Sequence, residues 1–158
     1  IFILMEVEAL IDSQDYIEYE MLEVSLNYWF NDQEDRRCPF PDYIKSDLRK
    51  AAITSFLNWT KKLSDDAKKE INDEILIERF EECLFEEAYK MVITEEEKIT
   101  VKYPFMLRCG DRVNYKDKPE SIVVKRELTN EGDTKYMQIT FEEIESGQMW
   151  NSSFELPE

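Results

Sequence analysis

The spacing of hydrophobic residues changes near residue 94 of the chain. Before that point, apolar residues recur every three or four positions, which is the period of one face of an α-helix. After it, apolar and polar residues alternate, which is the period of a β-strand. The pattern therefore predicts an α+β protein, with about three packed helices followed by a small antiparallel β-sheet or barrel.

The longest helical pattern covers residues 64–92 and predicts a single helix. Ser64 can accept a hydrogen bond from a backbone N–H of the first turn, where Asp65 and Asp66 suit the positive end of the helix dipole. Neither Gly nor Pro interrupts the run. The predicted buried stripe is Ala67, Ile71, Ile75, Phe80, Leu84, Ala88 and Met91.

Two further helical segments precede it, residues 5–31 and 42–62. In the first, the predicted buried positions are Ile17, Met21, Val24, Leu26, Tyr28 and Trp29. In the second, which follows Pro41, they are Ile44, Leu48, Ala52, Phe56, Trp59 and Leu63. Because only one residue separates the second segment from the third, we expect these two helices to form an antiparallel pair.

The last third of the chain has short alternating runs between turn residues, and it holds all three glycines. The predicted strands are residues 99–103, 112–115, 121–128, 135–141 and 148–156. Residues 129–133, with Gly132, are predicted to form the loop of a hairpin. This organisation predicts an acidic helical region, 1–98, and a β-rich region, 99–158, either as two domains or as parts of one compact domain.

Residues 105–113, Phe-Met-Leu-Arg-Cys-Gly-Asp-Arg-Val, resemble the opening of small SH3-like β-barrels. These modules often begin with an apolar residue, a Gly-Asp-x-Val motif and a strand, and several end with an aromatic-containing strand, as here with Trp150 and Phe154. The resemblance covers the last third only. It implies a ligand-binding or scaffolding barrel without catalytic residues.

The composition excludes most common catalytic and metal sites. The chain has no histidine, so it lacks the usual general base, the usual metal ligand and the imidazole of a catalytic triad. The three cysteines, Cys38, Cys83 and Cys109, are far apart, which predicts reduced thiols and a cytoplasmic location. The glutamates of residues 70–87 fit a solvated helix face better than a cation site. We therefore expect no cofactor, no metal and no enzymatic activity, and no apolar run is long enough to span a membrane.

Net charge is the strongest functional signal, because it reaches −16 at pH 7. Residues 1–98 carry 25 acidic and 12 basic side chains, whereas residues 99–158 carry 11 and 8. Such a surface repels nucleic acid and suits a protein partner with a basic surface. The sequence thus predicts a non-catalytic adaptor or scaffold protein, and it leaves self-association open.

The alternative prediction is a DNA-mimic inhibitor, in which carboxylates occupy the DNA site of a nucleic-acid-binding protein. For either function, the predicted partner-binding residues lie in the acidic N-terminal segment. They are Glu6, Glu8, Asp12, Asp15, Glu18, Glu20 and Glu23.

Overall fold

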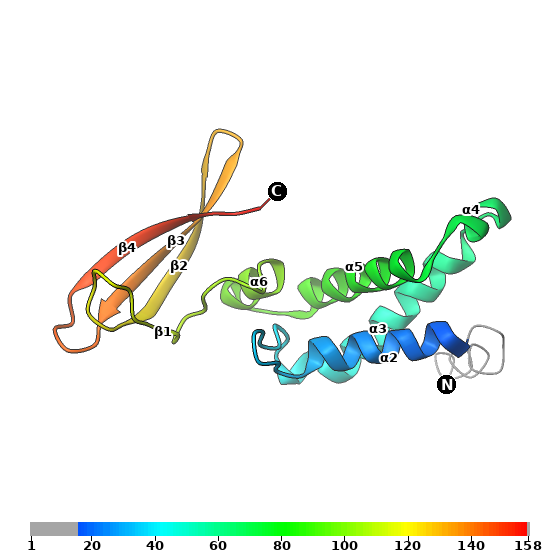
Figure 1. The fold of residues 1–158 in the computed structure, drawn as a ribbon, viewed down its shortest axis with the longest axis horizontal. Coiled ribbons are helices and arrows are strands. Elements are labelled where there is room, and N and C mark those ends of the chain that lie inside the picture. The colour runs from blue at the N-terminus through cyan, green and yellow to red at the C-terminus, as the bar shows by residue number, and fades with distance from the viewer. Residues whose placement is uncertain (1–15, 158) are drawn as a thin grey trace. The chain divides into compact units, whose positions relative to one another are not determined.

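The computed structural model describes residues 16–157, and their side chains from residue 20 onward. The chain divides into two compact units, one ending at Pro104 and the other beginning at Phe105. The first unit contains the five described helices, and the second contains a four-stranded sheet (Figure 1). The predicted α+β class, with helices first and an antiparallel sheet after them, is confirmed.

The helical unit consists of α2 (Tyr16–Phe30), α3 (Asp42–Lys61), α4 (Asp65–Glu70), α5 (Asp73–Met91) and α6 (Glu95–Lys102). The start of α3 directly after Pro41 is as predicted, because proline suits the entry to a helix. Of the predicted first helical segment, the part before residue 16 lies outside the described residues.

The prediction of one helix over residues 64–92 is wrong, because the chain leaves the helical conformation between α4 and α5. Ile71 is extended, with φ −83° and ψ 130°, and Asn72 Oδ1 accepts the N–H of Ile75 at 2.9 Å. Asparagine at this position caps a new helix instead of continuing the old one. Asp73 and Glu74 then favour the positive end of α5, as Asp65 and Asp66 do in α4.

The predicted strand over residues 99–103 is also wrong, since this segment belongs to α6 and the residue that ends it. Thr94 and Glu97 form a capping box: Thr94 Oγ1 accepts the N–H of Glu97 at 3.1 Å, and Glu97 Oε1 accepts the N–H of Thr94 at 2.9 Å. This reciprocal cap fixes the first turn and outweighs the β-branched residues that follow. The boundary predicted between residues 98 and 99 therefore falls inside a helix.

The helical core is centred on the contact between α3 and α5, which run antiparallel as predicted (Figure 1). Phe56 of α3 meets Phe80 of α5 edge to face, with ring centroids 5.6 Å apart. Cys83 is fully buried in the same core, where it packs as a small apolar side chain. The buried members of this core are Leu22, Leu26, Trp29, Phe40, Ile44, Leu48, Ala52, Ile53, Phe56, Leu57, Phe80, Cys83, Leu84, Ala88, Val92 and Val101.

The sheet of the second unit has the strand order β1 (Arg112–Val113), β2 (Ser121–Glu131), β3 (Thr134–Glu143) and β4 (Met149–Glu155), with every neighbouring pair antiparallel. These strands confirm the four sequence-predicted strands that follow residue 110. The β2–β3 hairpin is tighter than predicted, because Glu131 pairs with Thr134. Gly132, with φ +60°, supplies the left-handed position of a two-residue turn.

One face of this curled sheet, a half-barrel, is buried. Met137, Ile139 and Phe141 alternate along β3 and are completely buried, as the strand period predicts. On β2, Val123 and Arg126 are both buried because a bulge interrupts the register between Val123 and Lys125. The buried guanidinium of Arg126 donates through Nη1 to the carbonyl of Leu107 at 2.9 Å.

At the other end of this face, Trp150 of β4 stacks on Phe141, with centroids 4.1 Å apart. Its Nε1–H donates to Ser121 Oγ at 3.0 Å, which directs the indole across β3 towards β2. Gly110 of the Gly-Asp-x-Val motif has φ +93°, and its N–H donates to the carbonyl of Val123. The motif therefore makes the turn that leads into β1.

We predict that Leu84→Ala lowers the free energy of unfolding of the helical unit by about 2–5 kcal/mol, because it leaves a cavity in a fully buried site. The measurement is chemical denaturation followed by far-UV circular dichroism. Ile75, on the same helix, was predicted to be buried, but this is wrong, because it is 41% exposed at the start of α5. Ile75→Ala is therefore the control, with an expected cost of about 1 kcal/mol or less. Equal losses for the two variants would contradict the assignment of the core.

We also predict a pH-dependent contribution from Glu97. The backbone N–H of Thr94, followed by the hydroxyl of Tyr43, holds the pKa of Glu97 below its ordinary value of 4.5. Because the pKa of Glu97 is lower in the folded state than in the unfolded state, the ionised carboxylate stabilises the folded state above pH 4.5. This stabilisation is lost as the pH falls through the folded-state pKa and the carboxylate becomes protonated. Glu97→Gln should therefore be less stable than the wild type at neutral pH, and the difference should shrink in acid.

The measurement is the free energy of unfolding of wild type and Glu97→Gln across this pH range. Glu95→Gln removes a charge from the same first turn and serves as the control, without the same loss. A difference between Glu97→Gln and wild type that stays constant with pH would refute the role of the Glu97 carboxylate.

Candidate protein-interaction site

The position of α2 on α5 is set by Trp29. Its ring meets Phe85 of α5 edge to face, with centroids 4.8 Å apart, and its Nε1–H donates to Glu81 Oε2. Only 8% of Trp29 is exposed. A large apolar ring with one satisfied polar atom is well suited to hold two helices in one register.

The first basic residue of the chain, Arg36, reinforces this contact from the loop after α2. Its Nη2 donates to the carbonyl of Tyr28 near the helix end, where a positive charge complements the negative end of the dipole. Its guanidinium carbon lies 3.9 Å from the Tyr28 ring centroid and 4.5 Å from that of Trp29. The arginine is buried and so acts as part of the core.

A groove of about 450 Å³ lies between α2 and α5. Its apolar lining includes Val24 and Tyr28, which are 69% and 45% exposed. The sequence pattern placed both residues in a buried stripe, and this part of the prediction is wrong: Leu22, Leu26 and Trp29 are the buried positions. The complete lining is Glu20, Met21, Val24, Ser25, Tyr28, Ile77 and Glu81.

Ser25 gives the groove a polar atom that lacks a partner. The residue is only 7% exposed, and its hydroxyl has no hydrogen-bond partner within the part of the chain that the structure describes. A buried hydroxyl without a partner is unfavourable, so a ligand atom that bonded to it would gain more than one that bonded to an exposed group.

The rim of the groove is acidic. Glu20 of α2 is exposed, and the carboxylate of Glu81 of α5 accepts the indole N–H of Trp29. Glu74 and Glu78, exposed on α5, add carboxylates on either side of Ile77 in the sequence. An apolar floor with carboxylates around it is suited to a partner that is apolar on one side and positively charged at its edges.

Most predicted partner-binding residues cannot be assigned to this groove. Glu6, Glu8, Asp12 and Asp15 lie outside the described residues, as does the side chain of Glu18. Glu20 lines the groove. Glu23 instead forms a two-bond ion pair with Arg49 of α3, in which Nη1 lies 3.1 Å from Oε2, so its carboxylate joins two helices.

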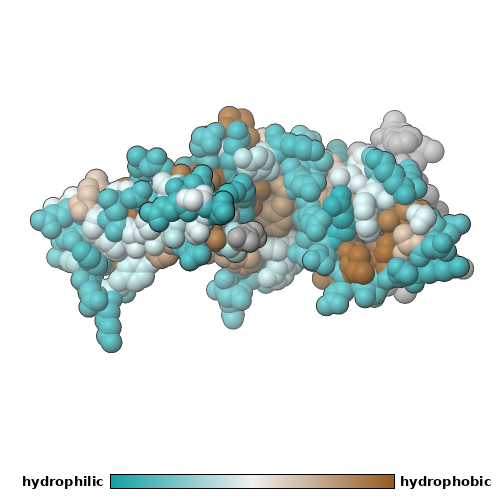
Figure 2. Space-filling model, turned by 90° about the horizontal axis from the view of Figure 1, so that it is seen from above, coloured by the Kyte–Doolittle hydropathy of each residue, from teal (hydrophilic) through white to brown (hydrophobic). Residues whose placement is uncertain are grey.

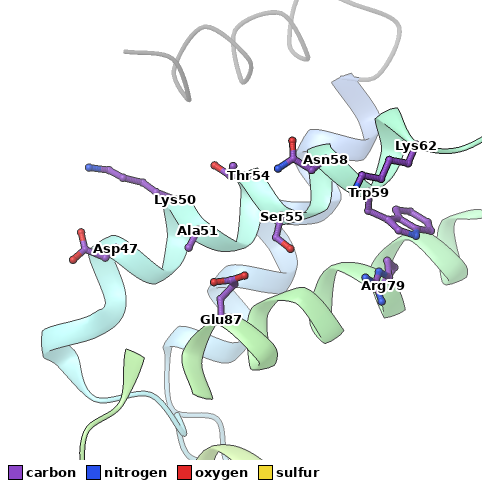
Figure 3. A pocket seen from close by; sticks show the side chains of 10 residues that line it. All are labelled: Asp47, Lys50, Ala51, Thr54, Ser55, Asn58, Trp59, Lys62, Arg79 and Glu87. Atoms are coloured by element: carbon purple, nitrogen blue, oxygen red, sulfur yellow. The ribbon is translucent and has the colours of Figure 1, made fainter. Parts of the chain in front are cut away.

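A second, more polar pocket of about 660 Å³ lies along α3 and α5. Figure 3 shows Ser55 and Glu87 between the helices, Trp59 beside Arg79, and Lys50 extending away from α5. Arg79 is partly neutralised by Glu82 at 2.8 Å, and its guanidinium lies 5.7 Å from the Trp59 ring centroid. The lining of this pocket carries both positive and negative side chains.

Other kinds of site receive no support from the described part of the chain. Residues 16–157 contain no group of three or more His, Cys, Asp or Glu side chains placed to hold a metal ion. None of the three cysteines is part of a disulfide bond in the structure. Among the helices of the described residues, none is long and apolar enough to cross a membrane.

Searches of protein-family models, curated proteins and solved structures found no match to this chain.

The exposed apolar residues are divided among small areas of the surface. Figure 2 shows a mostly hydrophilic surface with separate hydrophobic patches. The groove is not evident from the sequence, because Val24 and Tyr28 are chemically similar to core residues. The signal that could have revealed it is that α2 has apolar residues on more than one side and is more hydrophobic on average than α3 or α5.

Proposed function

We propose that the protein is a non-catalytic interaction protein that binds a basic, amphipathic helix of a partner protein in the groove between α2 and α5. The observation that carries this proposal is the combination of exposed Val24 and Tyr28, the unpartnered Ser25 hydroxyl and the flanking carboxylates. Each feature alone is common, but together they define one kind of ligand.

The groove determines the chemistry of this partner. Apolar side chains at helical spacing cover Val24, Tyr28 and Ile77, because a helix that docks in a groove presents residues at i, i+3 or i+4 and i+7. Lysine or arginine on its flanks faces Glu20 and Glu81. The excess of acidic residues in the helical region accelerates the encounter and rejects acidic competitors.

The half-barrel has a separate role in this proposal, as a second interaction module. Its resemblance to SH3-like barrels rests on the Gly110-Asp111-Arg112-Val113 turn and on the aromatic strand β4. The three thiols are compatible with work in a reducing compartment such as the cytoplasm.

A selection from a displayed library of helical peptides tests the proposal even though the partner is unidentified. We predict that peptides enriched on the wild-type chain carry a net positive charge and an apolar i, i+4, i+7 stripe. Val24→Asp should weaken their binding by about tenfold or more, because it places a charge in the apolar floor. Affinity should also fall as salt is raised.

Ile93→Asp is the matched control, since Ile93 is exposed but does not line the groove. Glu81→Gln removes the negative charge of the groove rim but keeps a side-chain oxygen that can accept the hydrogen bond from the Trp29 indole N–H. It therefore tests the contribution of the charge alone. Enrichment of acidic or uncharged peptides, or binding unaffected by Val24→Asp, would show that the groove has another ligand or none.

DNA mimicry is the second candidate, and a row of exposed carboxylates on α5 favours it. Glu74, Glu78, Glu82 and Glu86 recur every four residues and are all exposed. This spacing repeats a negative charge about every 6 Å along the helix. Arg79 offsets part of this charge through Glu82, which weakens the mimicry.

If mimicry is correct, proteins captured from a lysate on the immobilised chain should be displaced by duplex DNA. Replacing the four α5 glutamates by glutamine should reduce this capture several-fold, while Val24→Asp should leave it unchanged. Capture that resists duplex DNA but is lost in Val24→Asp would exclude mimicry and favour the helix-binding groove.

A further inference from the structure

The half-barrel has one long strand edge that no described residue pairs with. β4 is the last strand of the sheet, and Figure 1 shows it at the margin beside β3. The opposite edge strand, β1, is only two residues long and has the ion pair of Arg112 with Glu120 beside it. Short strands and charges are the usual means by which proteins protect sheet edges.

β4 has little of this protection, because it is seven residues long and its single charged residue, Glu155, is at its last position. Its register with β3 is continuous from Met149 to Glu155, without a bulge. The segment 148–154 contains no charged residue and no proline, although 35% of the chain is charged. A regular edge whose residues are uncharged from Gln148 to Phe154, in a protein with a net charge of −16, is open to pairing with another strand.

The direction of the unused backbone groups follows from the hydrogen bonds that flank β4. The N–H of Leu156 donates to the carbonyl of Lys135 at 2.9 Å, and the N–H of Glu143 donates to that of Gln148 at 2.8 Å. The backbone N–H and C=O groups of successive residues point to opposite sides of an antiparallel strand. The N–H and C=O groups of Trp150, Ser152 and Phe154 therefore point towards β3. Those of Met149, Asn151, Ser153 and Glu155 point out of the sheet, and these four side chains are exposed.

We infer that β4 pairs antiparallel with β4 of a second copy of this chain, so that two half-barrels form one continuous sheet. The strand has seven residues with Ser152 at its centre, so full overlap places Ser152 on the two-fold axis. Asn151 of each copy then exchanges two hydrogen bonds with Ser153 of the other.

The same register is complementary in its side chains. Trp150 of each copy lies opposite Phe154 of the other, on the face that carries Phe141, with the small Ser152 between the two aromatic pairs. Trp150 already leans over Phe141, so Phe154 of the second copy occupies its outer side. Cross-strand aromatic pairs stabilise sheets, and Glu155 faces Met149 instead of a like charge.

The first experiment compares Ser153→Pro with Ser153→Ala by sedimentation velocity of the 158-residue chain over a wide concentration range. Proline removes an N–H that points away from β3, and each dimer loses two symmetry-related bonds. We expect the dimer dissociation constant to rise by about tenfold or more, whereas Ser153→Ala stays close to wild type. A wild type that remains monomeric throughout, or a folded Ser153→Pro that dimerises normally, would overturn the inference.

The second experiment does not depend on the folding of the proline variant. In a background with Cys38 and Cys109 replaced by serine, Ser152→Cys should form a disulfide-linked dimer on mild oxidation. Facing residues in the non-hydrogen-bonded position have Cα atoms about 4.5 Å apart, within the disulfide range. Asn151→Cys faces Ser153 of the other copy and should not crosslink, so equal crosslinking of the two variants would refute this register.

Discussion

The contact of Trp29 with α5 is the interaction on which the helical unit depends. Its ring packs on Phe85, its indole N–H is satisfied by Glu81, and the guanidinium of Arg36 covers it from the following loop. A single side chain thereby joins α2, the loop and α5. Because its polar atom has a partner, the ring contributes its apolar area to the core without an unsatisfied donor.

The groove exists because this contact leaves part of α2 exposed among the described residues. Leu22, Leu26 and Trp29 face the core, while Val24 and Tyr28 stand on another side of the helix. Ser25 is buried between these two sides, and its hydroxyl has no partner. The helix therefore keeps apolar surface that the α3–α5 core does not cover, and this is the surface that the proposed partner helix would bury.

The partners proposed for the two units differ in charge. The carboxylates on the helical unit favour a positively charged ligand and disfavour a second copy of the same unit. On the half-barrel, β4 has a single charged residue, Glu155 at its end, so hydrogen bonds along the rest of its edge can form with little electrostatic repulsion. A self-paired sheet would display two acidic grooves in one assembly, which would increase the affinity for a partner with two basic helices.

The sequence by itself determined the α+β class, the start of α3 and the four strands after Gly110, because these depend on periodicity, proline and glycine, which act within a few residues. The break at Asn72 was also encoded locally, in a cap followed by two acidic residues, but helix-forming neighbours obscured it. Tertiary structure alone decided which apolar residues of α2 are buried. Val24 and Leu26 are chemically alike, and only the position of α5, fixed through Trp29 and Phe85, leaves one exposed and buries the other.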